Sequence, residues 1–541
     1  MWSATVWTMT DMRWGAWGVD ADRMTLSDQV LELLRQGLGV TPGETPVPSM
    51  AKARVPDSAL STAAVEAFAT EVGADQVRTD RDSRLLHVGG KSTVDLWRRR
   101  AGDARQAPDA VILPVDHDEV LGVLRVAAEQ GVAVVPFGGG TSVVGGVEPE
   151  RGDFGAVVAL DLRRLNRLVE VDDVSMTARI EPGLRGPDAE ALLAEHGLTI
   201  GHFPQSFEYA SVGGFAATRS AGQASSGYGR FDDLVVALRV ATPRGSLELG
   251  RAPASAAGPD LRQLFLGSEG ALGVITEVTL RVRPAPATRH DEAWAFTDFA
   301  TGAAAVRSLA QSGALATVTW LSDEAETAVN LAMGGDVGTA GPASDGCLLV
   351  AGHEGTEAQV ETARAAAATL LTEADGQPLG SDAASGWRAG RFRAPYLRDA
   401  LLDAGAQVET LETATSWSRL DALYAAVRDA VTESLTAAGT PALVLCHISH
   451  AYPTGASLYF TVVAKAADDP IAQWTAAKRA AGDAIVAQGA TITHHHAVGI
   501  DHRAWMAAEV GALGLDVLRS VKATVDPAGI LNPGKLLPPP D

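Results

Sequence analysis

The chain has 541 residues, of which 46% are hydrophobic, which is typical of a globular protein with more than one domain and excludes a disordered or fibrous chain. Lysine and arginine number 44 against 66 aspartates and glutamates, so the formal net charge is −22, which excludes a protein that wraps nucleic acid or binds broadly to anionic lipid. The two cysteines are too few for a disulfide framework and predict a reducing compartment, by default the cytoplasm. The N-terminal sequence has no basic stretch followed by an apolar one, so we expect no secretory leader.

Residues 1–103 are predicted to form an N-terminal extension that packs on the main body. Helical patterns flank a proline-rich stretch, VTPGETPVPSMAKARVP. Trp14 and Trp17 are interpreted as packing residues, since large aromatic side chains mostly bury apolar area.

Residues 104–286 are predicted to form an α/β domain. DAVILPV and VAVVP predict strands, and DHDEVLGVLRVAAEQG between them predicts a helix that Gly131 ends. AVVALDL, SMTARIEPG, LVVALRVATPRG and GVITEVTLRVRPAP predict further strands, and GPDAEALLAEHG predicts a helix.

Beyond residue 286 the composition shifts to alanine-rich amphipathic helices separated by short strands. FATGAAAVRSLAQSG predicts such a helix, and CLLVAGHEG and ASLYFTVVAK predict strands. We place a second domain over residues 287–475 and a helical C-terminal segment, which returns to the first domain, over residues 476–541.

The glycine-rich stretch PFGGGTSVVGG follows a predicted buried strand. Consecutive glycines let backbone N–H groups converge on an anion, and two hydroxyls follow them, which predicts a diphosphate-binding loop. A structural tight turn is the alternative. Neither a G-x-G-x-x-G fingerprint nor a P-loop is present. Because SVGGFAATRSAG and GSEGALGVITE follow in order, we predict that one extended dinucleotide contacts all three stretches.

Three adjacent histidines occur in ITHHHAVG, a short stretch of a chain that has 12 histidines in all. A purification tag is an unsuitable explanation, because tags are terminal. Adjacent side chains diverge on a strand or a helix, so a shared metal ion is disfavoured and we predict no metal site. A solvated loop is the ordinary alternative.

The ordered motifs PFGGGTS, GHFPQSFEYASVGGFAATRSAG, DLVVALRVATPRG and GSEGALGVITEVTLRVRP resemble FAD-binding proteins of the vanillyl-alcohol oxidase and p-cresol methylhydroxylase type. MRWGAWG, RFRAPYLRD, GASLYF and ITHHHAVG resemble the alkylglycerone-phosphate synthases, flavoenzymes of ether-lipid synthesis. The resemblance implies an α+β fold with a two-subdomain FAD-binding domain of the p-cresol methylhydroxylase type, an α/β cap domain and a helical C-terminal segment that completes the active site. It also implies noncovalent FAD, because no histidine or cysteine stands in the glycine loop.

The resemblance carries the family's FAD contacts onto four runs of this chain. These residues are Pro136, Phe137, Gly138, Gly139, Gly140, Thr141 and Ser142; Gln205, Ser206, Phe207, Glu208, Tyr209, Ala210 and Ser211; Thr218, Arg219, Ser220 and Ala221; and Glu269, Gly270, Ala271, Leu272, Gly273, Val274 and Ile275.

The same resemblance implies that Tyr459 and one or two of His494, His495 and His496 move protons beside the flavin, since a near-neutral imidazole can take or give a proton. Which imidazole faces the flavin stays open. Arg398 is implied as an anion clamp, because its guanidinium fork suits phosphate or carboxylate. The alternatives are a packed tyrosine ring and a surface pair between Arg398 and Asp399.

The implied reaction exchanges an acyl for an alkyl group through an adduct at flavin N5. Trp320 stands where the synthases carry an arginine, and Ala497 where they carry a glycine. Trp320 and the C-terminal VDPAGILNPGKLL favour the alternative, an FAD-linked oxidase or dehydrogenase of a 2-hydroxy acid or related alcohol. A flavin-binding protein without catalysis is a third hypothesis. We expect a small-molecule or lipid-like substrate, no nucleic acid, peripheral membrane contact and a homodimer.

Overall fold

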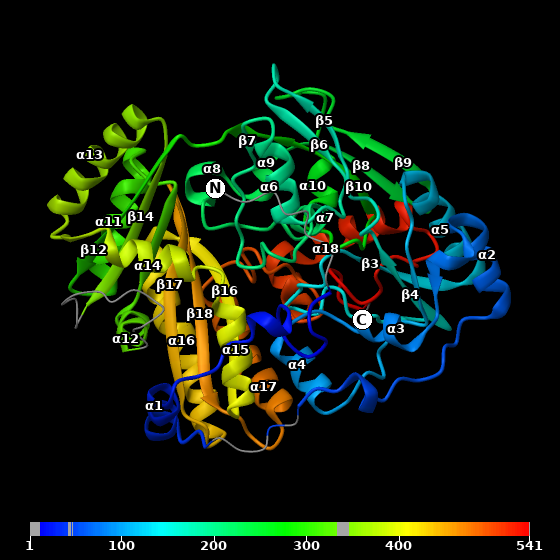
Figure 1. Cartoon of the computed structure of the whole chain (residues 1–541), viewed down its shortest axis with the longest axis horizontal. Helices are drawn as coiled ribbons and strands as arrows, with labels where there is room; N and C mark the ends of the chain where they lie inside the picture. The colour runs from blue at the N-terminus through cyan, green and yellow to red at the C-terminus, as the bar shows by residue number, and fades with distance from the viewer. Residues whose placement is uncertain (1–10, 42–44, 46, 333–345, 540–541) are drawn as a thin grey trace.

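The computed structural model describes residues 11–41, 45, 47–332 and 346–539. It contains a four-stranded, a five-stranded and a seven-stranded sheet, with one further strand pair. In Figure 1 the seven-stranded sheet lies on the left, and the four- and five-stranded sheets lie on the right.

The first subdomain is built on the four-stranded sheet, in the order β1-β2-β4-β3, with β2, β4 and β3 parallel. Its elements, with the segments before it, are η1 Asp20–Asp22, α1 Asp28–Leu38, η2 Met50–Lys52, α2 Thr62–Val72, η3 Ala74–Gln76, β1 Val77–Arg78, α3 Arg81–Leu86, α4 Thr93–Arg100, β2 Ala110–Ile112, α5 His117–Gln130, β3 Val132–Phe137 and β4 Ala156–Asp161. The Asp116 carboxylate caps α5 by accepting from the Glu119 amide, and Gly131 ends the helix in the left-handed conformation.

The predicted N-terminal extension is therefore not a separate layer. Strand β1 pairs with β2, and α2 and α5 pack together in one hydrophobic core. Residues 62–78 share the core and sheet of the first subdomain, so the boundary expected at 103 falls between the paired strands β1 and β2, whereas Leu96 and Trp97 of α4 pack on Leu402 of the cap domain. Trp14 and Trp17 are buried, as predicted for packing residues.

The second subdomain is an antiparallel sheet in the order β5-β6-β10-β8-β9, beside the strand pair β11-β7. Its elements are β5 Leu168–Asp172, β6 Thr177–Ile180, α6 Gly186–Ala194, β7 Leu198–Thr199, α7 Val212–Thr218, α8 Ser225–Tyr228, α9 Phe231–Leu234, β8 Val235–Thr242, β9 Gly245–Leu249, α10 Arg262–Phe265, β10 Val274–Arg281 and β11 Arg283–Pro284. Its core lies between this sheet and the helices α6 and α7.

The cap domain is an antiparallel sheet in the order β15-β12-β14-β13-β17-β18-β16. Its elements are β12 Thr288–Phe296, α11 Phe299–Ser312, β13 Val318–Ser322, α12 Glu324–Ala332, β14 Cys347–Gly355, α13 Glu357–Glu373, β15 Gln377–Gly380, α14 Asp382–Gly390, α15 Ala394–Asp403, β16 Ala406–Ser416, η4 Trp417–Arg419, α16 Leu420–Ala437, β17 Ala442–Tyr452, β18 Gly455–Lys465 and α17 Pro470–Ala487. Helices α11, α13, α16 and α17 bury apolar side chains against one face, and this core excludes water from that side of the sheet.

The C-terminal segment returns to the FAD-binding region, through η5 Arg503–Trp505 and α18 Met506–Val525. Met506 and Leu515 of α18 enter the core of the second subdomain, and Leu531 forms a bridge with Val134 of β3. The boundary expected at 475 lies inside α17, so this segment begins after that helix. Among the described residues, no helix is both long and apolar enough to cross a bilayer.

Candidate active site

The glycine loop that follows β3 contacts the second predicted cofactor segment so closely that no side chain fits between the two backbones. A Cβ on Gly139 would lie 2.0 Å from the carbonyl oxygen of Tyr209, and a Cβ on Gly138 would lie 2.3 Å from the Ser211 hydroxyl. Gly140 has a φ of +65°, where side chains are strained. Glycine is required here because any Cβ would push the two segments apart.

The third predicted segment packs against the first two. The Glu269 amide donates to the Ala217 carbonyl at 2.9 Å. A Cβ on Gly270 would lie 2.6 Å from the Pro136 ring. The three glycine-bearing stretches that are far apart in the sequence therefore lie against one another.

Unpaired polar groups in these segments fit a dinucleotide. Within the described ranges, nothing accepts a hydrogen bond from the amides of residues 139–142, and the buried Gln205 Nε2 also has no acceptor. Donors of this kind suit phosphate and ring oxygens. The buried Glu269 Oε1 and Asn532 Oδ1 accept no hydrogen bond, and such acceptors suit ribose hydroxyls. These residues fit FAD.

The run from Thr218 to Ala221 connects the second and third segments. Arg219 has a φ of +51°, and its guanidinium donates to the carbonyls of Leu266 and Gln263, both at 2.9 Å. Its side chain therefore holds the chain that leads to Glu269. Direct contact of this run with FAD stays a prediction.

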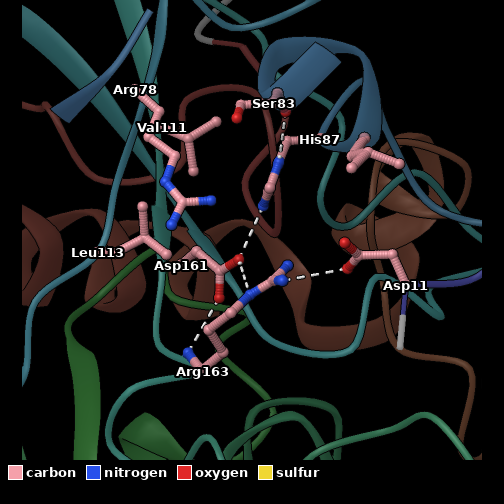
Figure 2. A pocket seen from close by; sticks show the side chains of 9 residues that line it. Asp11, Arg78, Ser83, His87, Val111, Leu113, Asp161 and Arg163 are labelled. Carbon is pink, nitrogen blue, oxygen red and sulfur yellow. Dashed lines mark hydrogen bonds and ion pairs between the residues drawn. The ribbon is translucent and has the colours of Figure 1, made fainter. Parts of the chain in front are cut away.

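A polar pocket lies behind the glycine loop, where Figure 2 shows Asp161 at the end of β4 between His87 and Arg163. Asp161 is 2.8 Å from His87 Nε2 and 2.6 Å from Arg163 Nε. Arg163 also reaches Asp11 at 3.1 Å. Because Asp161, His87, Arg163 and Asp11 pair with one another, they tie the N-terminal segment to β4.

The histidine run is held by a buried carboxylate that the sequence analysis did not identify. Glu412 of β16 is 1% exposed. It accepts hydrogen bonds from the amides of His494, His495 and His496 at 2.6, 3.2 and 2.9 Å, and from the Thr493 hydroxyl at 2.6 Å. The run is thus neither a solvated loop nor a strand.

Tyr459 lies in one row with Glu412 and a further histidine. In the sheet register, Tyr459 of β18 faces Glu412 of β16 on one side and His447 of β17 on the other. Its ring stacks on His447 at 4.9 Å between centroids and on His495 at 5.8 Å, and it meets the His496 ring edge-on at 5.5 Å. The structure therefore brings together Tyr459 and the histidine run, which were predicted as one site.

A fourth histidine joins the cluster because β17 contains a bulge. Strand β17 has one extra residue between Ile448 and Ala451 relative to β18. The bulge puts His450 on the same face as His447, and its ring lies 5.0 Å from that of His494. The alternation of a regular strand would place His447 and His450 on opposite faces, which is why periodicity could not identify this residue.

The three imidazoles of the run differ in their engagement. Both ring nitrogens of His494 have partners, Nε2 with the Tyr452 hydroxyl at 2.7 Å and Nδ1 with His495 Nδ1 at 3.0 Å. Among the described residues, none forms a hydrogen bond with His495 Nε2 or with either ring nitrogen of His496. The imidazoles available to a substrate are therefore those of His495 and His496.

Burial sets the protonation of these groups. It lowers the pKa of His495 to about 3 and that of His496 to about 4, although the Glu412 charge opposes the shift. It raises the pKa of Tyr459 above its usual range. Burial also acts to raise the pKa of Glu412, but the histidines and its hydrogen-bond donors hold that pKa well below normal. Near neutral pH the site therefore contains neutral imidazoles, a protonated phenol and a carboxylate.

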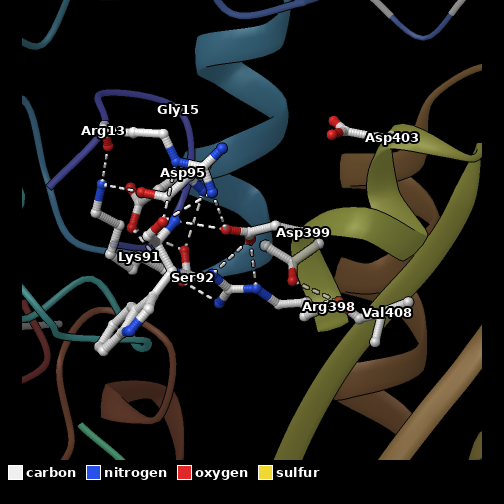
Figure 3. Close-up of polar contacts among 12 residues, drawn as sticks. Arg13, Gly15, Lys91, Ser92, Asp95, Arg398, Asp399, Asp403 and Val408 are labelled. Carbon is white, nitrogen blue, oxygen red and sulfur yellow. Dashed lines mark hydrogen bonds and ion pairs between the residues drawn. The ribbon is translucent and has the colours of Figure 1, made fainter. Parts of the chain in front are cut away.

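Arg398 is buried in a network with the N-terminal strap, which we define as residues 13–17. Figure 3 shows Arg398 and Asp399 of α15 facing Arg13 and Lys91. The Arg398 guanidinium donates twice to Asp399, at 3.0 and 3.2 Å, and to the Lys91 carbonyl at 2.6 Å. The Arg398–Asp399 pair exists, but it is buried rather than on the surface. The role of Arg398 as an anion clamp stays a prediction.

Lys91 fastens the strap. Its ammonium group donates to the carbonyls of Arg13 and Ala16, at 2.6 and 2.8 Å, and its amide donates to the Ser142 carbonyl at 2.7 Å. The Trp17 amide donates to Asp399 at 2.5 Å. The strap thus connects the glycine loop to α15 of the cap domain.

Trp320 and Ala497 occupy the positions where the sequence departs from the synthase pattern. Trp320 lies 5.1 Å from the His447 ring, at the end of the row that contains Tyr459, so it borders the site. Ala497 has a φ of +75°, a left-handed conformation that favours glycine. The Cβ of Ala497 is therefore held in a backbone conformation that glycine adopts without strain.

The chain matches family models for an FAD binding domain over residues 108–249 and for the C-terminal domain of FAD linked oxidases over residues 285–536. It is 34% identical over 482 residues to alkyldihydroxyacetonephosphate synthase of Dictyostelium discoideum, covering 86% of this chain and 79% of that protein. It is 33% identical over 520 residues to the enzyme of that name from Trypanosoma brucei brucei, covering 92% and 84%. The chain belongs to the alkyldihydroxyacetonephosphate synthase family. It is an FAD-dependent enzyme of this type with a small-molecule substrate.

Solved structures agree with this family assignment. A crystal structure of an alkyldihydroxyacetonephosphate synthase superposes with a TM-score of 0.84 at 30% identity, covering 97% of this chain and 99% of that one. p-Cresol methylhydroxylase superposes with a TM-score of 0.69 at 16% identity, covering 87% and 96%, and shows the fold alone. The predicted α+β fold is confirmed.

Proposed function

We propose that this enzyme replaces the acyl group of an acyl dihydroxyacetone phosphate with a long-chain alcohol. The carbon–oxygen bond to the acyl group breaks and a carbon–oxygen ether bond to the alcohol forms. The fatty acid leaves with the proton of the alcohol, so there is no net oxidation or reduction. The observation that carries the proposal is the row of Glu412, Tyr459 and His447 beside the histidine run, in a chain of this family.

The protonation states give the residues different roles in proton transfer. Neutral His495 and His496 can accept a proton from the substrate carbon or the alcohol, whereas protonated Tyr459 can donate one to a substrate oxygen. When bound, FAD supplies a ring nitrogen that can activate a substrate carbon. Cap-domain packing on the far side of the sheet closes that face of the strands to water.

Arg398 supports recognition of the phosphate. Burial raises the pKa of Tyr459, and the Arg398 charge acts in the opposite direction. A phosphate near this position would compete with Asp399 for the guanidinium fork. For Arg398 to act as the clamp, its guanidinium must therefore bind both the strap network and the substrate.

The second candidate is oxidation of a 2-hydroxy acid, with FAD as the electron acceptor. The apolar Trp320 ring at the end of the row favours it, because a site that contains this bulky ring suits a small acid better than it suits a phosphate headgroup. In this reaction Arg398 would hold the carboxylate and His495 or His496 would accept the hydroxyl proton.

An anaerobic absorbance titration of the FAD-loaded protein separates the two. The synthase proposal expects no lasting reduction of the flavin by any 2-hydroxy acid. With acyl dihydroxyacetone phosphate and isotope-labelled hexadecanol, it expects label in a product that resists alkaline hydrolysis, as an ether does and an ester does not. Lasting flavin reduction by a 2-hydroxy acid, without an ether product, would overturn it.

We extend the proposal to a cytoplasmic homodimer that touches membranes peripherally to obtain the alcohol. The support is an apolar surface on α18, where Leu513 and Val517 are 76% and 53% exposed and one turn apart. Glu509 of the same helix accepts hydrogen bonds from Thr491 and Ile492, next to the histidine run.

Flotation with uncharged phosphatidylcholine vesicles tests the membrane contact. The native protein should be recovered with the vesicles, and Leu513→Asp should abolish this recovery. Equal recovery of both proteins would contradict the role of this surface in membrane binding.

A further inference from the structure

Four hydrogen bonds fill the acceptor capacity of the buried Glu412 carboxylate. Its two oxygens accept from the Thr493 hydroxyl and from three consecutive amides, those of His494, His495 and His496. Consecutive amides converge on one anion only when the backbone curls around it. The backbone of the histidine run is therefore curved around this carboxylate.

The carboxylate is fixed relative to the phenol. Glu412 and Tyr459 are register partners on β16 and β18, and both strands are paired along their whole length. Any group that is hydrogen-bonded to Glu412 is therefore held at a fixed position relative to Tyr459. Among the described residues, the other contacts of His495 and His496 with Tyr459 are ring contacts.

The carboxylate charge also lies near the two available imidazoles. Glu412 Oε2 is 3.7 Å from His495 Nδ1, and Oε1 is 3.9 Å from His496 Nδ1. These distances are too long for hydrogen bonds but short for a charge interaction in a buried site. A negative charge here stabilises the positive charge that either imidazole acquires on taking a proton.

We propose that Glu412 is the positioning residue of this active site: it curls the histidine run into place beside Tyr459 and stabilises the protonated state of His495 or His496 during turnover. The positioning rests on the contacts alone, whereas the effect on turnover rests on the proposed function.

The test compares Glu412→Gln with Glu409→Gln in the FAD-loaded protein. Glu409 is a matched control, because it is a buried glutamate of the same strand that accepts from the amides of Thr93 and Thr410 and has no contact with the histidine run. The first measurement is the rate at which diethyl pyrocarbonate modifies the peptide containing residues 494–496, read by mass spectrometry. Loss of a charged acceptor should raise this rate about tenfold in Glu412→Gln and leave it unchanged in Glu409→Gln.

The second measurement is turnover of acyl dihydroxyacetone phosphate with hexadecanol. Glu412→Gln should lower kcat about 100-fold with KM nearly unchanged, and Glu412→Asp should recover part of the loss because it keeps the charge. Equal modification rates and equal kcat in the two Gln variants would overturn the proposal. If the native enzyme does not turn over these substrates, the proposed function fails, and the modification rates alone decide the positioning role.

A gentler variant covers the case in which Glu412→Gln does not fold. Thr493→Val removes one donor to the carboxylate and keeps the side-chain volume. It should raise the modification rate several-fold, in keeping with about 1 kcal/mol for one hydrogen bond. A rate equal to that of the native protein would overturn the proposal.

Discussion

At the scale of single residues, the site depends on what burial does to ordinary side chains. Tyr459 stacks between His447 and His495, and burial raises its pKa so that it stays protonated. The same burial keeps the imidazoles neutral. A proton donor and a proton acceptor therefore coexist at one pH, within one cluster of rings.

We expect Tyr459→Phe to lower kcat about 100- to 1,000-fold, since it removes the proton donor and keeps the ring. The flavin absorbance should change little. Tyr424→Phe is the matched control, because Tyr424 is a cap-domain tyrosine that donates to Asp323 away from the row. Steady-state kinetics would check this, and equal kcat in both variants would remove Tyr459 from the chemistry.

We expect Ala497→Gly to stabilise the protein by up to about 1 kcal/mol, because relief of a left-handed alanine outweighs the added backbone entropy of glycine in the unfolded chain. The φ of +75° at Ala497 is the basis. The urea midpoint of the FAD-loaded protein would measure it. A lower midpoint would mean that the alanine methyl group contributes packing that exceeds the strain.

At the scale of elements, the strap is the segment whose stability depends on one side chain. Lys91 satisfies buried carbonyls of the strap, while its amide holds Ser142 and its carbonyl holds Arg398. Burial holds the pKa of Lys91 well below its usual range. The strap, the glycine loop and α15 therefore lose a common support if Lys91 is replaced.

Lys91→Met should lower the free energy of unfolding by about 1–3 kcal/mol, because it leaves strap carbonyls without donors. It should also speed proteolysis near Trp14. Arg23→Met is the control, since Arg23 makes an exposed pair with Asp403 that contributes less than about 1 kcal/mol. Urea unfolding and timed proteolysis would measure both effects; equal behaviour would show that the strap stands without Lys91.

Some of these elements follow from the sequence and others do not. Local signals predicted α5, with Asp116 and Gly131 at its ends, and β14 over Cys347–Gly355. The three glycine stretches lie against one another, an arrangement that one dinucleotide in contact with all three requires. The partner of the histidine run could not be predicted, because Glu412 reaches it through pairing of β16 with β18, a contact between distant segments. The available signal was the two glutamates in ETLETAT, a stretch whose threonines favour a strand.

At the scale of the whole molecule, buried histidines link stability to pH. Burial lowers the pKa values of His202, His450 and His495 to about 3, and those of His496 and His502 to about 4. Their unfolded pKa is near 6.5, so below that pH the unfolded chain binds protons that the folded chain does not. Burial raises the pKa values of Glu190 and Glu269 to about 7, which has the opposite sign, but these groups are fewer.

Stability should therefore fall as the pH is lowered from 6.5 to 4.5, by up to about 1.4 kcal/mol per pH unit for each net proton. Urea unfolding at pH 5, 6 and 7 would measure the slope. His502→Asn, which can still donate to the Ala497 carbonyl, should flatten it by about one proton. Equal stability at pH 5 and 7 would mean that these histidines are already protonated in the folded state.

The bulge in β17 determines which one-residue deletions the hairpin of β17 and β18 can accept. Deleting Ser449 would leave His447 and His450 two residues apart, so regular alternation would keep both on one face, with Ile448 and Ala451 in the core. A codon added at the turn, Pro453–Thr454, would leave both faces as they are. Descendants of this gene can therefore vary at the tip of the hairpin, or lose Ser449, and keep both imidazoles on the same face, whereas deletion of His450 itself removes an imidazole from the active site in one step.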